Sequence, residues 1–165
     1  MVTPMLTKEI ILNYLEAVTD PEIPVLTIQD MGIIRDIKIL GEDAVEIFIT
    51  PTYSGCPAMS AIATNIRLEL ISRGVSNVKI SEQLSPAWTT DWMSEAGKTK
   101  LNAYGIAPPQ YRTKQNPENE QDVVVPCPLC NSTNTTLLSQ FGSTACKALY
   151  KCKDCLEPFD YFKCH

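Results

Sequence analysis

Two Cys-x-x-Cys pairs in the last quarter of the chain carry the clearest chemical signal in this sequence. They are Cys127/Cys130 and Cys152/Cys155. Each pair can form a tight turn that presents two thiolates, and two such turns can surround one tetrahedral ion, which is typical of a zinc ribbon. Because four protein ligands leave no open position for a substrate, we predict a structural Zn²⁺ that holds a binding surface in shape.

The sequence alone leaves alternatives both for the set of four ligands and for the metal. Cys146, Cys164 and His165 could each replace one of the four cysteines or hold a second ion. Soft sulfur ligands also suit iron, and Cys127-Pro-Leu-Cys130 resembles half of a rubredoxin site. The sequence therefore predicts the site more firmly than the identity of its ion.

The segment that holds these cysteines is too short to fold by apolar burial alone. With about forty residues, 123–165 has a size at which a metal or disulfides must add stability. A four-thiolate zinc site contributes roughly 10–16 kcal/mol, so we expect this part to be unfolded without its metal. The glycine expected after each Cys-x-x-Cys turn is Asn131 in one and Leu156 in the other.

Cys56 is a second candidate for chemistry, because it directly precedes Pro57 and a helical pattern. Proline suits the first helical position, which would place Cys56 at the N-cap. There the helix dipole and the N–H groups of the first turn stabilise a thiolate, which favours metal transfer or redox chemistry. The alternative is a small buried hydrophobe. Nucleophilic catalysis is a weaker interpretation, because the only histidine is His165, at the far end of the chain.

Asp20 and Glu22 could place carboxylates beside this thiol, as metal ligands or acid–base groups. They lie in the sequence Asp-Pro-Glu-Ile-Pro at 20–24, whose prolines must interrupt the preceding helix. On spacing alone we favour capping and solvation of this turn over a role in chemistry.

The elements that must position these residues follow an α-β-β-α-β order. We expect helices over about 7–18 and 56–74 and strands over 33–40, 44–50 and 75–81. This order predicts an α+β fold, a small two-layer domain. No helical or strand period is evident between Leu84 and the ribbon.

Three parts are therefore predicted: an α/β domain over 1–85, an aromatic docking segment and linker over 86–122, and the zinc ribbon over 123–165. Residues 86–109 contain Trp88 and Trp92, which a flexible linker would seldom carry, so they should pack on the first domain or on a partner. Residues 110–122 are polar enough for a true linker.

Composition and charge exclude several function classes. The formal net charge is −5, and residues 1–85 hold 11 of the 19 acidic but only 6 of the 14 basic side chains. That balance argues against nucleic-acid binding. No apolar run is long enough to span a bilayer, and the N-terminal residues show no export signal. Seven cysteines, clustered as metal ligands, fit a reducing cytosol, so we expect a soluble, cytoplasmic protein.

Longer motifs carry a family resemblance that covers nearly the whole chain. Residues 5–84 resemble the MIP18-type domain of iron–sulfur assembly factors through DPEIP at 20–24, DMGII at 30–34 and TYSGCP at 52–57. PAWTTDW at 86–92, YGIAPP at 104–109 and FGSTACKALY at 141–150 resemble the D-subunit family of bacterial phenylacetyl-CoA ring epoxidase systems.

The resemblance implies an accessory protein of aerobic phenylacetate degradation that assists iron–sulfur cluster or metal-centre maturation of the multicomponent oxygenase. Cys56 would be the functional thiol, with Asp20 and Glu22 near it, and could carry a transient iron or iron–sulfur cluster. The ribbon and the tryptophan segment would recognise the client, with the iron–sulfur flavoprotein reductase component favoured. The alternative is a structural subunit of the oxygenase complex without metal transfer.

We expect no independent catalytic activity. A single histidine cannot supply the two Glu-x-x-His motifs of a di-iron centre, so oxygen activation must reside in other components. Neither nucleic acid nor a membrane is expected as a partner, and whether the chain forms a homo-oligomer is left open.

Overall fold

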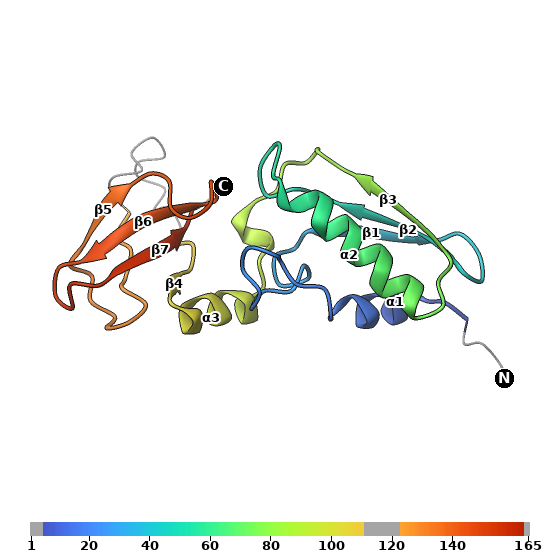
Figure 1. Cartoon of the computed structure of the whole chain (residues 1–165), viewed down its shortest axis with the longest axis horizontal. Coiled ribbons are helices and arrows are strands. Elements are labelled where there is room, and N and C mark those ends of the chain that lie inside the picture. Colours follow the sequence, from blue (N-terminus) through green and yellow to red (C-terminus); the bar gives the residue numbers. More distant parts are fainter. Residues whose placement is uncertain (1–4, 111–122, 164–165) are drawn as a thin grey trace. The chain divides into compact units, whose positions relative to one another are not determined.

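The computed structural model describes residues 5–110 and 123–163, and the chain divides into two compact units between Ser94 and Glu95 (Figure 1). Cys164, His165 and nearly all of the predicted linker lie outside the described residues. No helix in the described ranges is long and apolar enough to cross a membrane.

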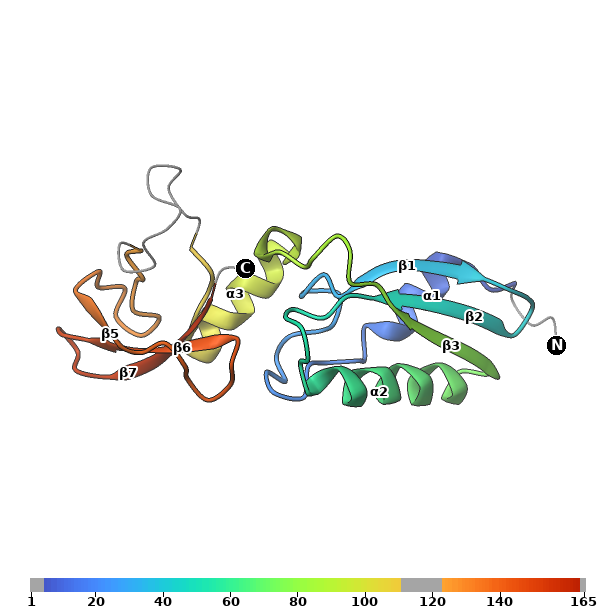
Figure 2. The same ribbon diagram turned by 90° about the horizontal axis from the view of Figure 1, so that it is seen from above.

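Unit 1, which ends at Ser94, is a two-layer α+β domain. Its elements are α1 (Lys8–Leu15), β1 (Ile34–Ile39), β2 (Ala44–Ile49), α2 (Ala58–Ser72), β3 (Asn77–Glu82) and a 3₁₀ turn, Thr90–Trp92. The sheet order is β1-β2-β3, with β1 antiparallel and β3 parallel to β2. Helix α2 lies along one face of the sheet, and α1 contacts α2 and β1 (Figure 2). The predicted α-β-β-α-β order is confirmed.

Helix α1 begins where the sequence predicts and ends earlier. The Thr7 hydroxyl caps it by accepting the N–H of Ile10 at 3.3 Å. It stops at Leu15, rather than continuing to about residue 18, because the chain then turns to form an isolated bridge between Thr19 and Thr27. The bridge closes the loop that contains the acidic proline turn.

Alternation along β2 and helical spacing along α2 build the core of unit 1. Every second residue of β2 is fully buried, and so is one face of α2; these residues are Val45, Ile47, Ile49, Ile62, Ile66 and Leu70. Pro57 already has helical dihedrals, with φ −67° and ψ −22°, so α2 starts immediately after the Cys56-Pro57 pair. At the other end, Gly74 takes a left-handed conformation with φ 91° and ends the helix.

The first part of the aromatic segment packs on unit 1. Trp88 is 4% exposed, and its indole N–H donates to the Met31 carbonyl at 2.8 Å. The backbone N–H of Ser94 donates to the Asp30 carbonyl at 2.8 Å, and the hydroxyl of Ser94 donates to the Asp30 carboxylate at 2.9 Å. Residues 86–94 are thereby fixed to the loop before β1, so buried Trp88 anchors its own unit and is not available to a client.

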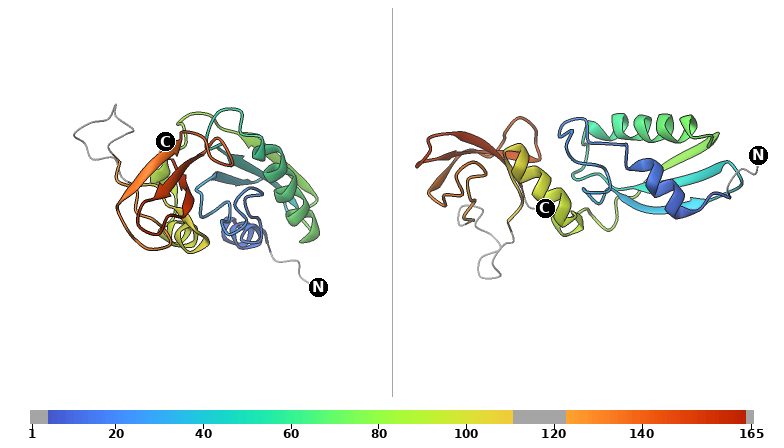
Figure 3. Two further views of the ribbon diagram at one scale, coloured as in Figure 1. Left: turned by 60° about the vertical axis from the view of Figure 1, so that its left-hand side comes forward. Right: turned by 90° about the horizontal axis from the view of Figure 1, so that it is seen from below.

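Unit 2 is a four-stranded sheet preceded by a helix. Its elements are α3 (Glu95–Tyr104), β4 (Ile106–Ala107), β5 (Thr135–Ser139), β6 (Lys147–Cys152) and β7 (Pro158–Phe162). The order is β4-β7-β6-β5, and β5, β6 and β7 pair antiparallel (Figure 3). Tyr150 stacks on Phe159 and meets Tyr161 edge to face in the small core. The predicted ribbon is confirmed, whereas α3 was not predicted, because only Gly97 and Leu101 of this helix are buried.

Candidate functional site

The two Cys-x-x-Cys turns bring four sulfur atoms together in unit 2. The Sγ atoms of Cys127 and Cys155 lie 3.8 Å apart, those of Cys130 and Cys152 lie 3.5 Å apart, and all four lie within 4.8 Å of one another. A tetrahedral zinc ion with Zn–S bonds of about 2.3 Å holds its sulfurs roughly 3.8 Å apart. The four cysteines therefore form a metal-binding site of the right size for one tetrahedral ion.

Other cysteines do not enter this group. Cys146 is buried beside the Thr144 hydroxyl, at 3.0 Å, and is not one of the four clustered ligands. The six described cysteines form no disulfide with one another. Within the described ranges, Cys146 is therefore not an alternative ligand.

Backbone geometry gives the two turns the same shape. The N–H of Cys127 donates to the Ser132 carbonyl at 2.9 Å, and the N–H of Cys152 donates to the Glu157 carbonyl at 3.0 Å. The residue after each turn is left-handed, with φ 60° at Asn131 and 68° at Leu156. These are the two positions at which the sequence lacks the expected glycine.

The Asp154 carboxylate links the two turns, which sequence reasoning missed. It accepts hydrogen bonds from the Ser132 hydroxyl and, at 2.7 Å, from the Asn134 side-chain amide. These two bonds hold the pKa of the Asp154 carboxyl below its usual range. The contact joins residues about twenty positions apart, so no local signal in the sequence could have identified it.

The environment of the sulfurs favours a cation at their centre. Backbone N–H groups of Cys155 and Asp154 lower the pKa of the Cys152 thiol to about 7. Although the Glu157 N–H lowers the pKa of the Cys155 thiol, burial and the three neighbouring sulfurs raise it to about 12. Without a metal, four close thiols do not all ionise, because each new negative charge opposes the next.

Replacement of Leu156 by glycine is expected to stabilise the metal-bound ribbon by roughly 0.5–1 kcal/mol. Leu156 is left-handed and 66% exposed, so burial compensates little of its backbone strain. Chemical denaturation of the metal-loaded Leu156→Gly variant measures the gain. Asn131→Gly is the matched control and should gain less, since asparagine tolerates this conformation. A less stable Leu156→Gly protein would contradict the expectation.

Cys56 lies one residue before Pro57, which is the N-cap of α2, and so one position earlier than the N-cap that the sequence predicted for it. Its N–H donates to the Tyr53 carbonyl and its carbonyl accepts the N–H of Met59, both at 3.2 Å. Gly55 immediately before it has φ 78°, which glycine adopts without strain. The helix has neither a side-chain cap nor an acidic residue in its first turn. The half-buried thiol therefore lies beside the positive end of a helix dipole.

A small cavity of about 100 Å³ lies next to the loop that leads to this thiol. Residues 50–54 line one part of it, and Leu84, Ala87 and Trp88 line another. The hydroxyl of Thr50 donates to the Gln83 carbonyl at 2.6 Å, which fixes the base of the loop. The buried Trp88 segment thus borders the thiol loop, a contact that the TYSGCP motif alone does not reveal.

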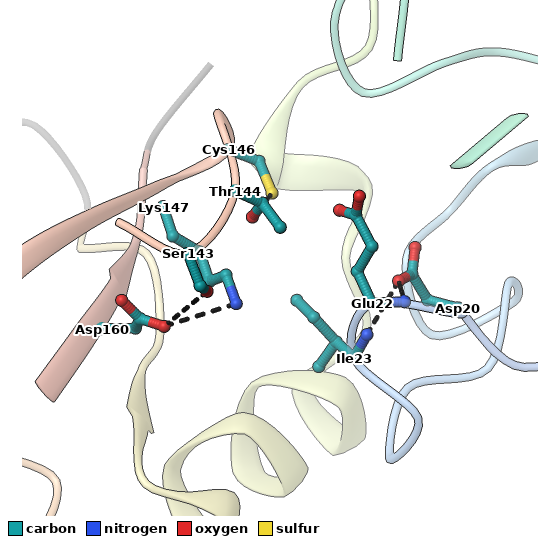
Figure 4. A network of polar contacts seen from close by, with 8 residues as sticks. All are labelled: Asp20, Glu22, Ile23, Ser143, Thr144, Cys146, Lys147 and Asp160. Carbon is teal, nitrogen blue, oxygen red and sulfur yellow. Dashed lines mark hydrogen bonds and ion pairs between the residues drawn. The ribbon is translucent and has the colours of Figure 1, made fainter. Parts of the chain in front are cut away.

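Asp20 caps its turn, the structural role that spacing favoured. One carboxylate oxygen accepts the N–H groups of Glu22, at 2.7 Å, and Ile23, at 2.9 Å, and the residue is buried (Figure 4). Among the described residues, the four ribbon cysteines are the one group of three or more potential ligands close enough to share an ion. Asp20, Glu22 and Cys56 do not form such a group, so a metal at Cys56 would need ligands from elsewhere.

Comparison with known proteins finds a matching family for each of the two parts of the chain. Residues 8–80 match the model of the iron-sulfur cluster assembly protein family, and residues 112–163 match that of the PaaD zinc beta ribbon domain. The crystal structure of a domain of unknown function, DUF59, from Bacillus anthracis is 26% identical, with a TM-score of 0.54, over 57% of this chain and 90% of that chain. The protein therefore combines an iron–sulfur assembly domain with a zinc ribbon.

Full-length similarity makes the family specific. The putative 1,2-phenylacetyl-CoA epoxidase D subunit of Escherichia coli is 50% identical over 153 residues, 91% of this chain and 88% of that protein. An Fe-S protein maturation auxiliary factor of Porphyromonas gingivalis is 36% identical over 58% of this chain and 90% of its own length. This chain belongs to the D-subunit family of phenylacetyl-CoA epoxidases, as its motifs suggested.

Proposed function

We propose that this protein is an accessory factor of a phenylacetyl-CoA epoxidase system in aerobic phenylacetate degradation, and that it assists maturation of a metal centre in that system. The observation that carries the proposal is the union, in one chain, of an iron–sulfur assembly domain with a thiol at a helix start and the ribbon of the epoxidase D-subunit family. The favoured client is the iron–sulfur flavoprotein reductase component.

In this proposal Cys56 supplies one thiolate ligand to an iron or iron–sulfur cluster that is cargo rather than a resident cofactor. The thiol directly precedes the first turn of α2, where the backbone N–H groups have no partner within the helix. A partner supplies the remaining ligands, because unit 1 does not gather a set of its own within the described residues. A cluster held by Cys56 alone is suited to transfer, because the client has to replace only one ligand from this chain.

The carboxylates have different parts in this scheme. Asp20 keeps the turn in one conformation through its two backbone hydrogen bonds. Glu22, which is partly exposed in the same turn, would place its carboxylate near the thiol. Both residues remain proposed members of the Cys56 site.

The ribbon would hold Zn²⁺ in a structural role. A closed set of four thiolates with sulfurs 3.5 to 4.8 Å apart suits a tetrahedral ion and offers no open position. We further propose that 1–85, 86–122 and 123–165 act as the assembly domain, docking segment and ribbon. The protein would act in the cytoplasm, without contact to membranes or nucleic acid and without catalysis of its own.

Replacement of Cys56 by serine is expected to leave both units folded and to lower the cluster content of the reductase component to the level found without this protein. Serine nearly matches the size of the thiol and removes the sulfur ligand. The measurement is iron and acid-labile sulfide per reductase, together with its visible absorption, after co-expression. Cys146→Ser is the matched control, because Cys146 lies outside the metal group. Full cluster loading with Cys56→Ser would exclude the transfer role.

A structural subunit of the oxygenase complex is the second candidate. It is favoured by the capping role of Asp20 and by the relative that carries the name of an epoxidase subunit. It predicts that the protein co-purifies with the other components at fixed stoichiometry and that Cys56→Ser changes neither stoichiometry nor cluster content.

A further inference from the structure

The loop between β5 and β6, residues 140–146, is longer than its connection requires. Antiparallel neighbours are usually joined by two to five residues, and this loop is held by contacts from several directions. It contains the first part of the FGSTACKALY motif, which neither the metal site nor the Cys56 site uses. The loop is therefore a feature that the proposed function has not yet explained.

An ion pair between a buried lysine and a partly exposed aspartate lies beneath the loop. The Lys147 ammonium, with the residue only 4% exposed, lies 3.3 Å from the Asp160 carboxylate, and the Ser143 hydroxyl donates to the same oxygen at 2.9 Å (Figure 4). Desolvation offsets most of the attraction in such a pair, so it contributes little net stability. The ion pair and the Ser143 hydrogen bond instead hold the loop in one conformation around Asp160.

Gly142 closes the loop against the same carboxylate. A Cβ atom at this position would lie 2.5 Å from an Asp160 oxygen, closer than any real contact. The Gly142 N–H donates to the Lys147 carbonyl at 2.8 Å, and the Lys147 N–H donates back to the Thr144 carbonyl at 3.1 Å. The loop thus packs closely on the Asp160 carboxylate, and a side chain at this position would require that carboxylate to move.

This arrangement presents one aromatic ring to the outside. Phe141 is 66% exposed, and its backbone N–H donates to the Ser139 hydroxyl at 3.2 Å. The Lys163 ammonium lies 4.6 Å from the ring centroid and donates to the Gln140 carbonyl at 3.0 Å. An exposed aromatic side chain on a preordered loop binds a partner with little further loss of conformational entropy.

We propose that Phe141 inserts into an apolar pocket on another protein component of the epoxidase system, with a carboxylate at the pocket rim that pairs with Lys163. The choice of a carboxylate follows from charge, because residues 140–146 contain no charged side chain and Lys163 is the cation beside the ring. The choice of a companion component follows from the relative that is named as one subunit among several of an epoxidase. The partner's identity rests on the proposed function, whereas the anchor does not depend on Cys56.

The test is direct binding of metal-loaded, full-length protein to each purified component of the epoxidase system, by biolayer interferometry. Phe141→Ala is expected to raise the Kd for one component about 30-fold, the size of an interface hot spot. Gly142→Val keeps the ring but distorts the loop, and should weaken the same interaction. Val124→Ala removes another exposed apolar side chain outside the metal-binding turns and is the matched control, with an expected change below about threefold. Lys163→Glu should weaken binding most at low salt.

Metal content per chain confirms that each variant keeps its ribbon. The proposal is overturned if Phe141→Ala binds as the unaltered protein does, if the unaltered protein binds none of the components, or if Phe141→Ala dissociates a homo-oligomer in sedimentation analysis, which would make a second copy the occupant. Cys56→Ser should bind normally and fail only in cluster loading, so the failure of each proposal can be told apart.

Discussion

Chelation of the ribbon metal is expected to unfold the region 123–163 and to leave unit 1 folded. The ribbon core rests on a few side chains, including Val125, Tyr150 and Phe159, and two of the metal ligands belong to the same core. Metal binding contributes roughly 10–16 kcal/mol in sites of this kind, more than so small a core supplies. Loss of the ion should therefore remove the cooperative fold of this region.

The sequence offers a clean way to measure this outcome. Both tryptophans, Trp88 and Trp92, lie in unit 1, so tryptophan emission reports on that unit alone. After chelation the emission should stay constant while the amide NMR signals of the ribbon lose their dispersion. Cys127→Ser should reproduce the effect, and Cys146→Ser should not. A ribbon that keeps dispersed signals after the metal has been removed would show that apolar packing suffices.

Replacement of Gly32 by alanine is expected to destabilise unit 1 by about 3 kcal/mol. Gly32 has φ 66°, and a Cβ atom there would lie 2.7 Å from Trp92 Cβ and also against the Trp92 backbone. The backbone conformation and the clash both oppose a side chain. The Arg35 guanidinium lies 3.5 Å from the Trp92 ring centroid. Trp92 therefore cannot move away from an added side chain without losing this cation–π interaction.

Gly74→Ala separates the two causes. Gly74 has φ 91°, but a Cβ atom at this position would meet nothing within 4 Å, so its replacement carries the conformational cost alone, about 1 kcal/mol. Urea denaturation followed by tryptophan emission compares the two variants. Equal losses of stability would mean that residues 90–94 are not packed against the loop that contains Gly32.

Local patterns in the sequence were sufficient for the order of elements in unit 1 and for the metal site. Alternation in β2 and helical spacing in α2 each depend on which face a residue buries, and the structure buries the expected faces. The four ribbon cysteines were identified because two i,i+3 pairs constrain geometry within each turn. The helix start at Cys56-Pro57 was identified because proline fixes its own φ.

Long-range contacts could not be predicted from local sequence patterns. The Ser94 hydroxyl meets the Asp30 carboxylate across 64 positions of sequence, and the Lys147–Asp160 pair forms only once two strands are in register. Helix α3 was missed because a narrow buried stripe gives little periodic signal. Which distant residues contact each other depends on the assembled fold, and local sequence patterns do not specify it.

The parallel alignment of β2 and β3 has a consequence for synthesis on the ribosome. The antiparallel β1 and β2 can pair as soon as both have emerged, but β3 can join only after the whole crossover helix α2 has been made. Trp88 arrives later still, and it borders the thiol loop. A nascent chain thus exposes Cys56 before its surroundings exist, so the cargo loading that we propose for Cys56 should begin only after the tryptophan segment has left the exit tunnel.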